Sequence, residues 1–181
     1  GGYYVAIRGK VSHSTPYQPY AWDDDLTIID GQKLDMKKPQ SYYVSTKRGI
    51  DAAQQAGKPF CLNVNISDPH KPFYTGAKDR NQPSKIFTAD EVPIPGFLFD
   101  HPAVRNELAH YSSSVRRADD CVGEILKALD ESGQADRTMV MFLSDHGMPL
   151  PFAKTQLYHH STHTPWIVRW PGKIKPDSVD D

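Results

Sequence analysis

A carboxylate and an imidazole lie side by side where an apolar run of the chain ends, at Asp145-His146-Gly147. A loop with prolines follows, and Lys154 closes it. Both side chains of the pair can bind a metal ion, and lysine is a compact cation that holds sulfate or phosphate oxygens as a point charge. The stretch therefore indicates chemistry on a tetrahedral anion. The triplet alone is also typical of a carboxylate that caps the segment after a strand.

Similar polar groups follow two other apolar runs. Lys10 and His13 come after residues 3–8, and His70 comes after residues 60–66. Lysines can hold an oxyanion, and histidines can donate or accept a proton because their pKa lies near neutrality. Each residue alone also fits an ordinary solvated lysine or loop histidine. Their shared position after successive strands is what favours a functional site.

The elements that must position these groups alternate between strands and helices. We expect strands at residues 3–8, 60–66, 138–143 and 166–170, and helices at 41–56 and 104–132. This order predicts an α/β fold with a largely parallel sheet flanked by helices, in which 138–143 is a buried parallel strand. Because ligands collect beyond the carboxyl ends of parallel strands, the polar groups are expected at one sheet edge.

The overall composition narrows the classes of function. The chain has 181 residues, enough for one domain, and its 21 basic and 22 acidic residues give a net charge of −1. This balance argues against a nucleic-acid partner, and no apolar run is long enough to span a membrane. Cys61 and Cys121 stand in apolar surroundings and are predicted to be buried free thiols. The acidic triplet at 23–25 is predicted to be a solvated turn.

Several motifs occur in an order that resembles the sulfatase family, within the alkaline-phosphatase-like superfamily. The matching pieces are GYYVA at 2–6 running into GKVSH at 9–13, DPHKPF at 68–73, the helix YSSSVRRADDCVGEILKALDESG, TMVMFLSDHG, Lys154 and TPWIVRWPG at 164–172. The loop DHGMPLPFAK is most similar to the heparan N-sulfatase (sulfamidase) branch. The resemblance implies an incomplete alkaline-phosphatase-like fold, with residues 1–181 forming part of the catalytic domain.

The resemblance also implies the role of each candidate residue. Lys10 and Lys154 match the lysines that hold the sulfate oxygens. His13 matches the histidine beside the nucleophile, and His70 matches the histidine that protonates the leaving oxygen or nitrogen.

Two cofactors are implied as well. Asp145 and His146 match the second pair of Ca²⁺ ligands, where a histidine departs from the usual preference of this ion for oxygen. The family nucleophile is a formylglycine made from the first residue of a Cys/Ser-x-Pro-x-Arg motif, and neither Cys61 nor Cys121 begins such a motif. We therefore expect that the strand carrying the nucleophile and the C-terminal subdomain lie outside this chain, and that the chain alone is inactive.

The expected function is hydrolysis of sulfate esters or sulfamates by the parent enzyme, with a sulfated carbohydrate or small molecule as the substrate. Two alternatives stay open. One is a phosphodiesterase or phosphonate hydrolase of the same superfamily, and the other is a non-catalytic domain that binds sulfated glycans. An uncovered sheet edge would also favour a homodimer or a domain-swapped assembly of this chain.

Overall fold

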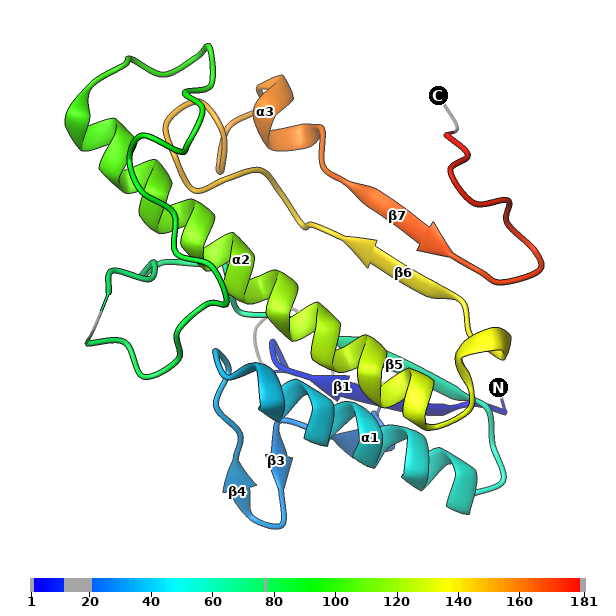
Figure 1. Cartoon of the computed structure of the whole chain (residues 1–181). Helices are drawn as coiled ribbons and strands as arrows, with labels where there is room; N and C mark the ends of the chain where they lie inside the picture. The colour runs from blue at the N-terminus through cyan, green and yellow to red at the C-terminus, as the bar shows by residue number, and fades with distance from the viewer. Residues whose placement is uncertain (1, 12–20, 77, 180–181) are drawn as a thin grey trace. The chain divides into compact units, whose positions relative to one another are not determined.

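The computed structural model describes residues 2–11, 21–76 and 78–179, and the chain forms two compact units (Figure 1). Unit 1 consists of Gly1–Phe87 and His110–Ser132, and unit 2 consists of Thr88–Ala109 and Gly133–Asp181. The long helix α2 (Pro102–Glu131) contributes residues to both units. Its bounds agree with the helix expected from the apolar periodicity at 104–132.

Unit 1 contains the predicted parallel sheet. Strand β1 (Tyr4–Arg8) pairs in parallel with β2 (Asp24–Asp25) on one side and with β5 (Phe60–Val64) on the other. A small antiparallel pair, β3 (Ile28–Ile29) with β4 (Gln32–Lys33), follows. The prediction of a solvated turn at 23–25 is therefore wrong. The backbone N–H groups of β1 needed partners on this edge, and the acidic segment supplies them, with the Asp23 carboxylate also accepting from Val5 N at 2.7 Å.

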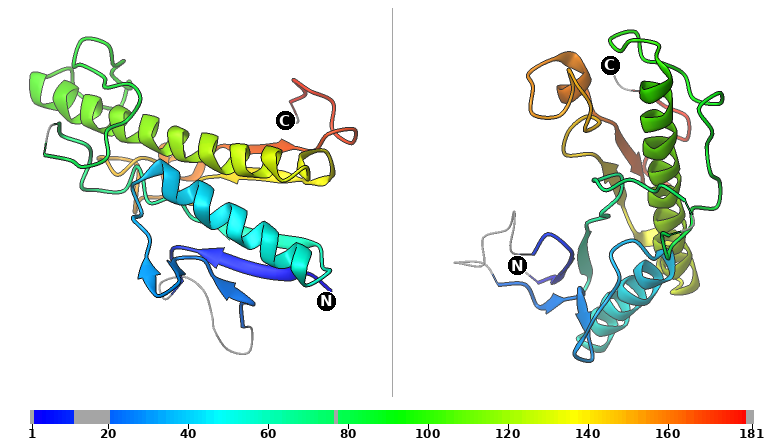
Figure 2. Two further views of the ribbon diagram at one scale, coloured as in Figure 1. Left: turned by 60° about the horizontal axis from the view of Figure 1, so that its bottom comes forward. Right: turned by 90° about the vertical axis from the view of Figure 1, so that its left-hand side faces the viewer.

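Helix α1 (Pro39–Gln55) covers this sheet, as Figure 2 shows from two directions. Its first residue is proline, which suits a position whose N–H needs no intrahelical partner. The helix ends before Gly57, which takes the left-handed conformation (φ 63°) that commonly follows a helix. A side chain at Gly49 would meet the side chains of Leu26 and Leu62 at 2.9 and 3.0 Å, so this glycine allows the helix to approach the sheet closely.

Unit 2 contains a second, two-stranded sheet. After a short 3₁₀ turn, η1 (Ala135–Arg137), strand β6 (Val140–Leu143) pairs antiparallel with β7 (Trp166–Arg169), and the short helix α3 (His159–Thr162) lies between them in sequence. The predicted β6 is therefore confirmed as a strand, but its expected buried, parallel environment is wrong. Met141, Phe142 and Leu143 are 52%, 41% and 59% exposed. A short apolar run does not reveal which strand it pairs with, so the sequence could not predict the antiparallel pairing and exposure of β6.

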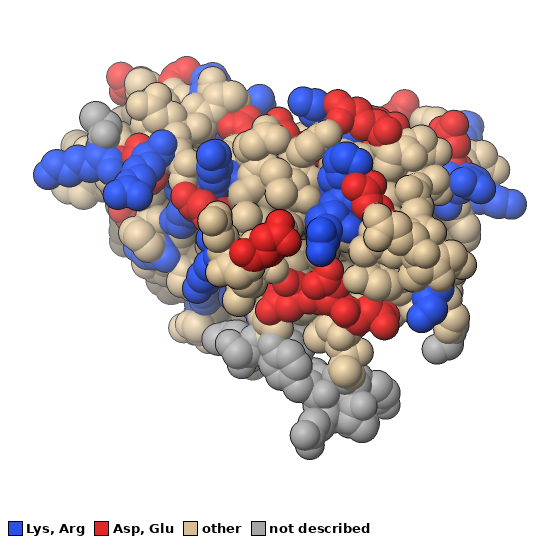
Figure 3. All heavy atoms as spheres, turned by 90° about the horizontal axis from the view of Figure 1, so that it is seen from below, with Lys and Arg blue, Asp and Glu red and all other residues tan. Residues whose placement is uncertain are grey.

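The surface carries charges of both signs, and the two cysteines differ in exposure. Acidic and basic side chains are interspersed on the face shown in Figure 3, as expected for a net charge of −1. Cys121 is buried as predicted, whereas Cys61 is exposed, because side chains along β5 alternate between the two faces of the strand. Within the described ranges, the helices are all too short or too polar to cross a membrane.

Candidate functional site

Two of the candidate residues follow adjacent parallel strands of unit 1. At the ends of these strands Arg8 is the register partner of Val64, so both strands finish at the same sheet edge. The turn after β1 is fixed by Asn65, whose backbone N–H donates to Arg8 O at 2.9 Å and whose side-chain amide donates to Gly9 O at 3.0 Å. Lys10 comes next and is exposed, with the left-handed φ of 58° that follows Gly9. This edge is the place where ligands collect in parallel sheets.

His70 lies in the turn that follows β5 and is exposed. Its backbone N–H donates to Ser67 O at 3.0 Å, and its ring Nδ1 lies 2.6 Å from Lys71 O. A carbonyl can only accept, so Nδ1 carries a proton in this arrangement and Nε2 is left to exchange a proton with a ligand. His13, the other candidate histidine, lies outside the described residues.

Asp68 is one of the polar groups that follow the second predicted strand, but the sequence assigned it no role and did not reveal its partner on α2. Asp68 is buried, and the Arg117 guanidinium binds both of its oxygens, Nε to Oδ2 at 2.6 Å and Nη2 to Oδ1 at 3.2 Å. One weak signal was present in the sequence, Arg117 on the helix that carries the apolar stripe. The pairing itself joins residues far apart in the chain and is visible only in the fold.

Unit 2 holds the other half of the candidate set. Asp145 and His146 follow β6, and Asp145 Oδ2 lies 3.5 Å from His146 Nε2. The ring Nδ1 of His146 is 2.8 Å from Gly147 O, and Ser144 Oγ donates to His146 O at 2.8 Å. With Nδ1 donating to the carbonyl, Nε2 of the neutral ring keeps a free lone pair, and it lies near the Asp145 carboxylate. The two groups are therefore able to share one cation.

Gly147 allows this loop to pack against α3. Its backbone N–H donates to Ser161 O at 3.0 Å, and a Cβ at this position would overlap the carbonyl oxygen of His160. The His160 ring is itself stacked on Phe97, with ring centroids 3.9 Å apart. The glycine of the Asp-His-Gly triplet is thus explained by close backbone approach.

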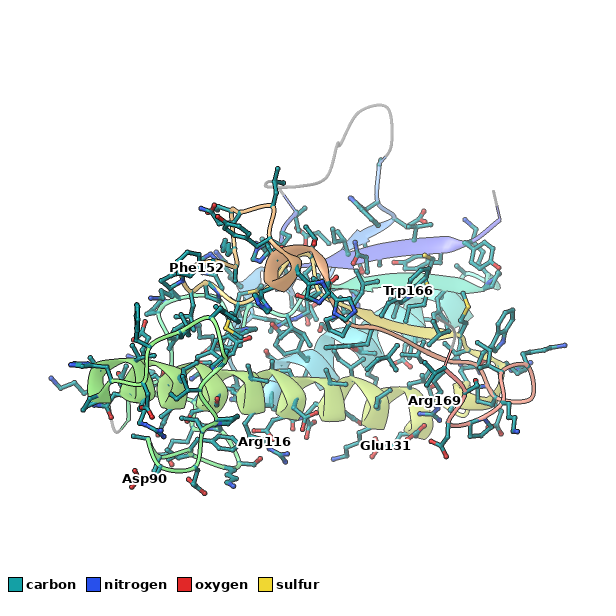
Figure 4. All side chains as sticks on the ribbon, turned by 90° about the horizontal axis from the view of Figure 1, so that it is seen from above. Asp90, Arg116, Glu131, Phe152, Trp166 and Arg169 are labelled. Carbon is teal, nitrogen blue, oxygen red and sulfur yellow. The ribbon has the colours of Figure 1, made fainter. Side chains whose placement is uncertain are left out.

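The loop that closes on Lys154 is compact. The backbone N–H of Lys154 donates to Met148 O at 3.1 Å, which brings the lysine back toward the Asp-His pair. Phe152 and Thr155 both adopt left-handed φ values, 64° and 69°, on either side of the buried Ala153. A shallow hollow is lined by this loop; its residues are Pro149, Leu150, Pro151, Phe152, Lys154, Thr155 and Gln156. Figure 4 labels Phe152 in this loop and Trp166 and Arg169 on β7.

The donor set tests how well a calcium ion would fit. Asp145 and His146 offer a carboxylate and a ring nitrogen, and their side chains are 73% and 35% exposed, so an ion could reach both. Calcium takes six to eight ligands, mostly oxygen. In the part of the chain that the structure describes, no group of three or more histidine, cysteine, aspartate or glutamate residues could hold a metal ion. Asp145 and His146 could therefore supply only some of the ligands of a calcium ion.

The chain has a parallel sheet with lysine and histidine after its strands, and a carboxylate–imidazole pair in a separate loop. Solved structures that resemble it have the alkaline-phosphatase-like α/β fold. The family model described as Sulfatase matches residues 10–181. The chain belongs to the sulfatase family. Enzymes of this family generally use Ca²⁺ and a formylglycine.

The chain is similar to curated sulfatases of bacteria and animals. It is 28% identical to the endo-4-O-sulfatase of Bacteroides thetaiotaomicron, over 90% of this chain and 34% of that protein. It is 31% identical to the N-sulphoglucosamine sulphohydrolase of Homo sapiens, over 94% of this chain and 37% of that protein. The chain thus spans about a third of the length of these relatives.

The fold is shared with a solved structure of a Bacteroides thetaiotaomicron protein from the metabolism of multiple glycosaminoglycans. It matches 96% of this chain and 46% of its own, with a TM-score of 0.65 and 21% identity. The predicted fold class and family are confirmed by these comparisons. Of the predicted site residues, Lys10 and His70 lie in unit 1, and Asp145, His146 and Lys154 lie in unit 2. Their roles in the reaction are predictions.

Proposed function

We propose that this chain supplies the sulfate-binding and proton-donating residues of an enzyme that hydrolyses sulfate esters or sulfamates of carbohydrates. The observation that carries the proposal is the shared edge of β1 and β5, where Lys10 and His70 follow adjacent parallel strands in a chain of the sulfatase family. An anion-binding cation and a proton donor at one sheet edge are two of the groups that such a hydrolysis requires.

Lys10 and Lys154 bind the sulfate oxygens in this proposal. Charge builds on these oxygens as sulfur is attacked, and fixed cations stabilise it more strongly than water does. Both lysines are held by their backbones: Lys10 follows the Gly9–Asn65 contact, and Lys154 is fixed by its bond to Met148. Preset positions of this kind need little rearrangement when the anion binds.

His70 delivers the proton to the leaving group. Its Nδ1 is held by Lys71 O, so the protonated ring presents Nε2–H to the oxygen or nitrogen that departs. A positioned histidine of this kind is suited to a leaving group near neutral pH. The same donor serves an ester oxygen and a sulfamate nitrogen, because either atom only needs a proton as its bond to sulfur breaks.

Asp145 and His146 would hold one side of the calcium ion, and the ion when bound adds positive charge next to the sulfate group. The remaining ligands and the formylglycine would come from the rest of the enzyme, since no Cys/Ser-x-Pro-x-Arg motif occurs in this sequence. The choice of a carbohydrate substrate is supported by the similarity to an endo-4-O-sulfatase and to an N-sulphoglucosamine sulphohydrolase.

We also propose that the chain by itself associates with a second copy. Among the described residues β5 pairs with β1 alone, and β6 and β7 expose several large apolar side chains; Met141, Phe142, Leu143, Trp166 and Ile167 are 41–73% exposed. Unpaired edges and exposed apolar strands favour pairing with another chain.

The anion site can be tested by titrating the chain with inorganic sulfate and following binding by calorimetry. Removing one charged contact should weaken sulfate binding roughly tenfold, so Lys10→Ala and Lys154→Ala should each do so. Lys58→Ala is the matched control, because this exposed lysine precedes β5 and so lies at the other end of the parallel sheet from Lys10.

Equal binding by all three variants and the unmodified chain would reject the sulfate-binding role of the two lysines. Turnover assays on the whole enzyme then separate the alternatives. A preference for a phosphate diester over a sulfate ester would favour a phosphodiesterase. Binding of sulfated glycans without turnover would favour a non-catalytic glycan-binding domain.

A further inference from the structure

The turn that carries His70 is anchored by a buried ion pair. Asp68, two residues before His70, has a side chain that is 1% exposed, and its partner Arg117 on α2 is 0% exposed. The guanidinium binds the carboxylate through two nitrogens, at 2.6 and 3.2 Å. This paired geometry fixes the orientation of the carboxylate as well as its position.

Arg117 also holds a second loop. Its Nη1 donates to Asn81 O at 2.7 Å and lies 3.0 Å from Asp79 Oδ2. Burial alone lowers the pKa of Arg117, but the hydrogen bonds to Asp68 and Asp79 hold that pKa above its ordinary value. The guanidinium is therefore a permanent cation that ties residues 68, 79 and 81 to one point on the helix.

Lys37 also binds the turn that carries His70. Its Nζ lies 3.4 Å from Asp68 Oδ1 and donates to Pro72 O at 2.6 Å. These contacts reach the turn on both sides of His70. Ser67, at its start, donates its backbone N–H to the Tyr42 hydroxyl at 3.2 Å.

His70 itself has no such anchor among its described contacts. In the part of the chain that the structure describes, its hydrogen bonds join it to Ser67 and Lys71, within its own turn. The position of the imidazole is therefore set by whatever holds residues 67–72. The contacts described above do this through Asp68 and the Pro72 carbonyl.

We propose that Arg117 and Lys37 are positioning residues that act through Asp68 to aim the His70 imidazole. The proposal rests on the proposed function, in which His70 donates a proton to the leaving group. A buried carboxylate that loses its partner must find water or another donor, so the turn would move, and the imidazole would move with it. Small displacements of a reacting group cost rates far more than they cost binding.

The first measurement follows the His70 imidazole by ¹⁵N NMR in the chain, in Lys37→Met, Asp68→Asn and Arg117→Lys variants. The Nδ1–Lys71 bond favours one tautomer, which keeps the two ring nitrogen signals of the neutral imidazole well separated. We expect each variant to shift these signals toward the average of two tautomers. The matched control is Lys47→Met, which breaks the exposed Lys47–Asp51 pair at 2.9 Å on α1 and should leave the His70 signals unchanged.

Lys37→Met keeps the test decisive if the buried variants do not fold, because the Lys37 side chain is 22% exposed and lies at the margin of the pair. A folded Lys37→Met chain, confirmed by circular dichroism, whose His70 signals equal those of the unmodified chain overturns the proposal. Shifted His70 signals support it.

The second measurement is turnover by the whole enzyme. Misplaced proton donation should lower kcat by roughly 10- to 100-fold in Lys37→Met while KM changes by less than about threefold. Equal losses in the Lys47→Met control would indicate a general structural effect and would refute the positioning role. If the NMR signals respond to these variants but not to added sulfate, the positioning role stands and the sulfatase chemistry of this site fails.

Discussion

The glycine of the Asp-His-Gly triplet gives the sharpest structural prediction in unit 2. Gly147→Ala adds a single methyl group at a point where the loop touches the backbone of α3. That carbon would overlap His160 O and would lie 2.9 Å from His160 C and 3.0 Å from Ser161 Cα. All three are atoms of the backbone, so no side-chain rotation can relieve the contact. The loop and the helix must separate.

Two losses contribute to the expected cost. Forcing an additional carbon into a packed contact typically costs about 1–3 kcal/mol. Separation also stretches the hydrogen bond from Gly147 N to Ser161 O, now 3.0 Å, and a bond of this kind is worth about 0.5–1.5 kcal/mol. We therefore expect Gly147→Ala to destabilise unit 2 by about 2–4 kcal/mol.

Urea unfolding followed by tryptophan fluorescence reports on both units, because Trp166 and Trp170 lie in and after β7 in unit 2 and Trp22 lies in unit 1. Gly123→Ala is the matched control, because Gly123 lies within α2 and has no atom within 4 Å of the new carbon. This change should stabilise the helix by about 0.5–1 kcal/mol. Opposite signs for the two alanines are expected. A Gly147→Ala chain as stable as the unmodified chain would refute the close-approach explanation of the triplet.

Two further predictions concern alkaline stability and self-association. Burial raises the pKa of Tyr42 from 10.0 to about 12, so the folded state keeps this proton longer than the unfolded state does. The resulting stability is fully present below about pH 10 and is lost as pH rises toward 12, by at most about 2–3 kcal/mol. Thermal unfolding between pH 8 and 12 should show this loss, and Tyr42→Phe should flatten the profile; an unchanged profile contradicts the assignment. Light scattering should find the chain as a dimer or larger, and Phe142→Lys with Trp166→Lys should shift it to monomer. A clean monomer without substitution argues against the proposed association.

The sequence by itself determined the local elements and the family. The apolar stripe of α2, the strands after which lysine and histidine appear, and the Asp-His-Gly triplet depend on neighbouring residues, so a linear pattern records them. The parallel pairing of β1 with β5 followed from the alternation of strands and helices. These features predicted the fold class and, through the order of the motifs, the sulfatase family, and the comparisons confirmed both.

The tertiary structure decided what depends on partners that are distant in the chain. The pairing of β6 with β7, the strand formed by Asp24 and Asp25, and the exposure of Cys61 all depend on which segment lies alongside. The bond between Asp68 and Arg117 joins residues 49 positions apart. The sequence around a carboxylate in a proline-rich turn does not indicate which arginine will neutralise it. Only the packing of α2 against that turn brings the two charges together and removes them from water.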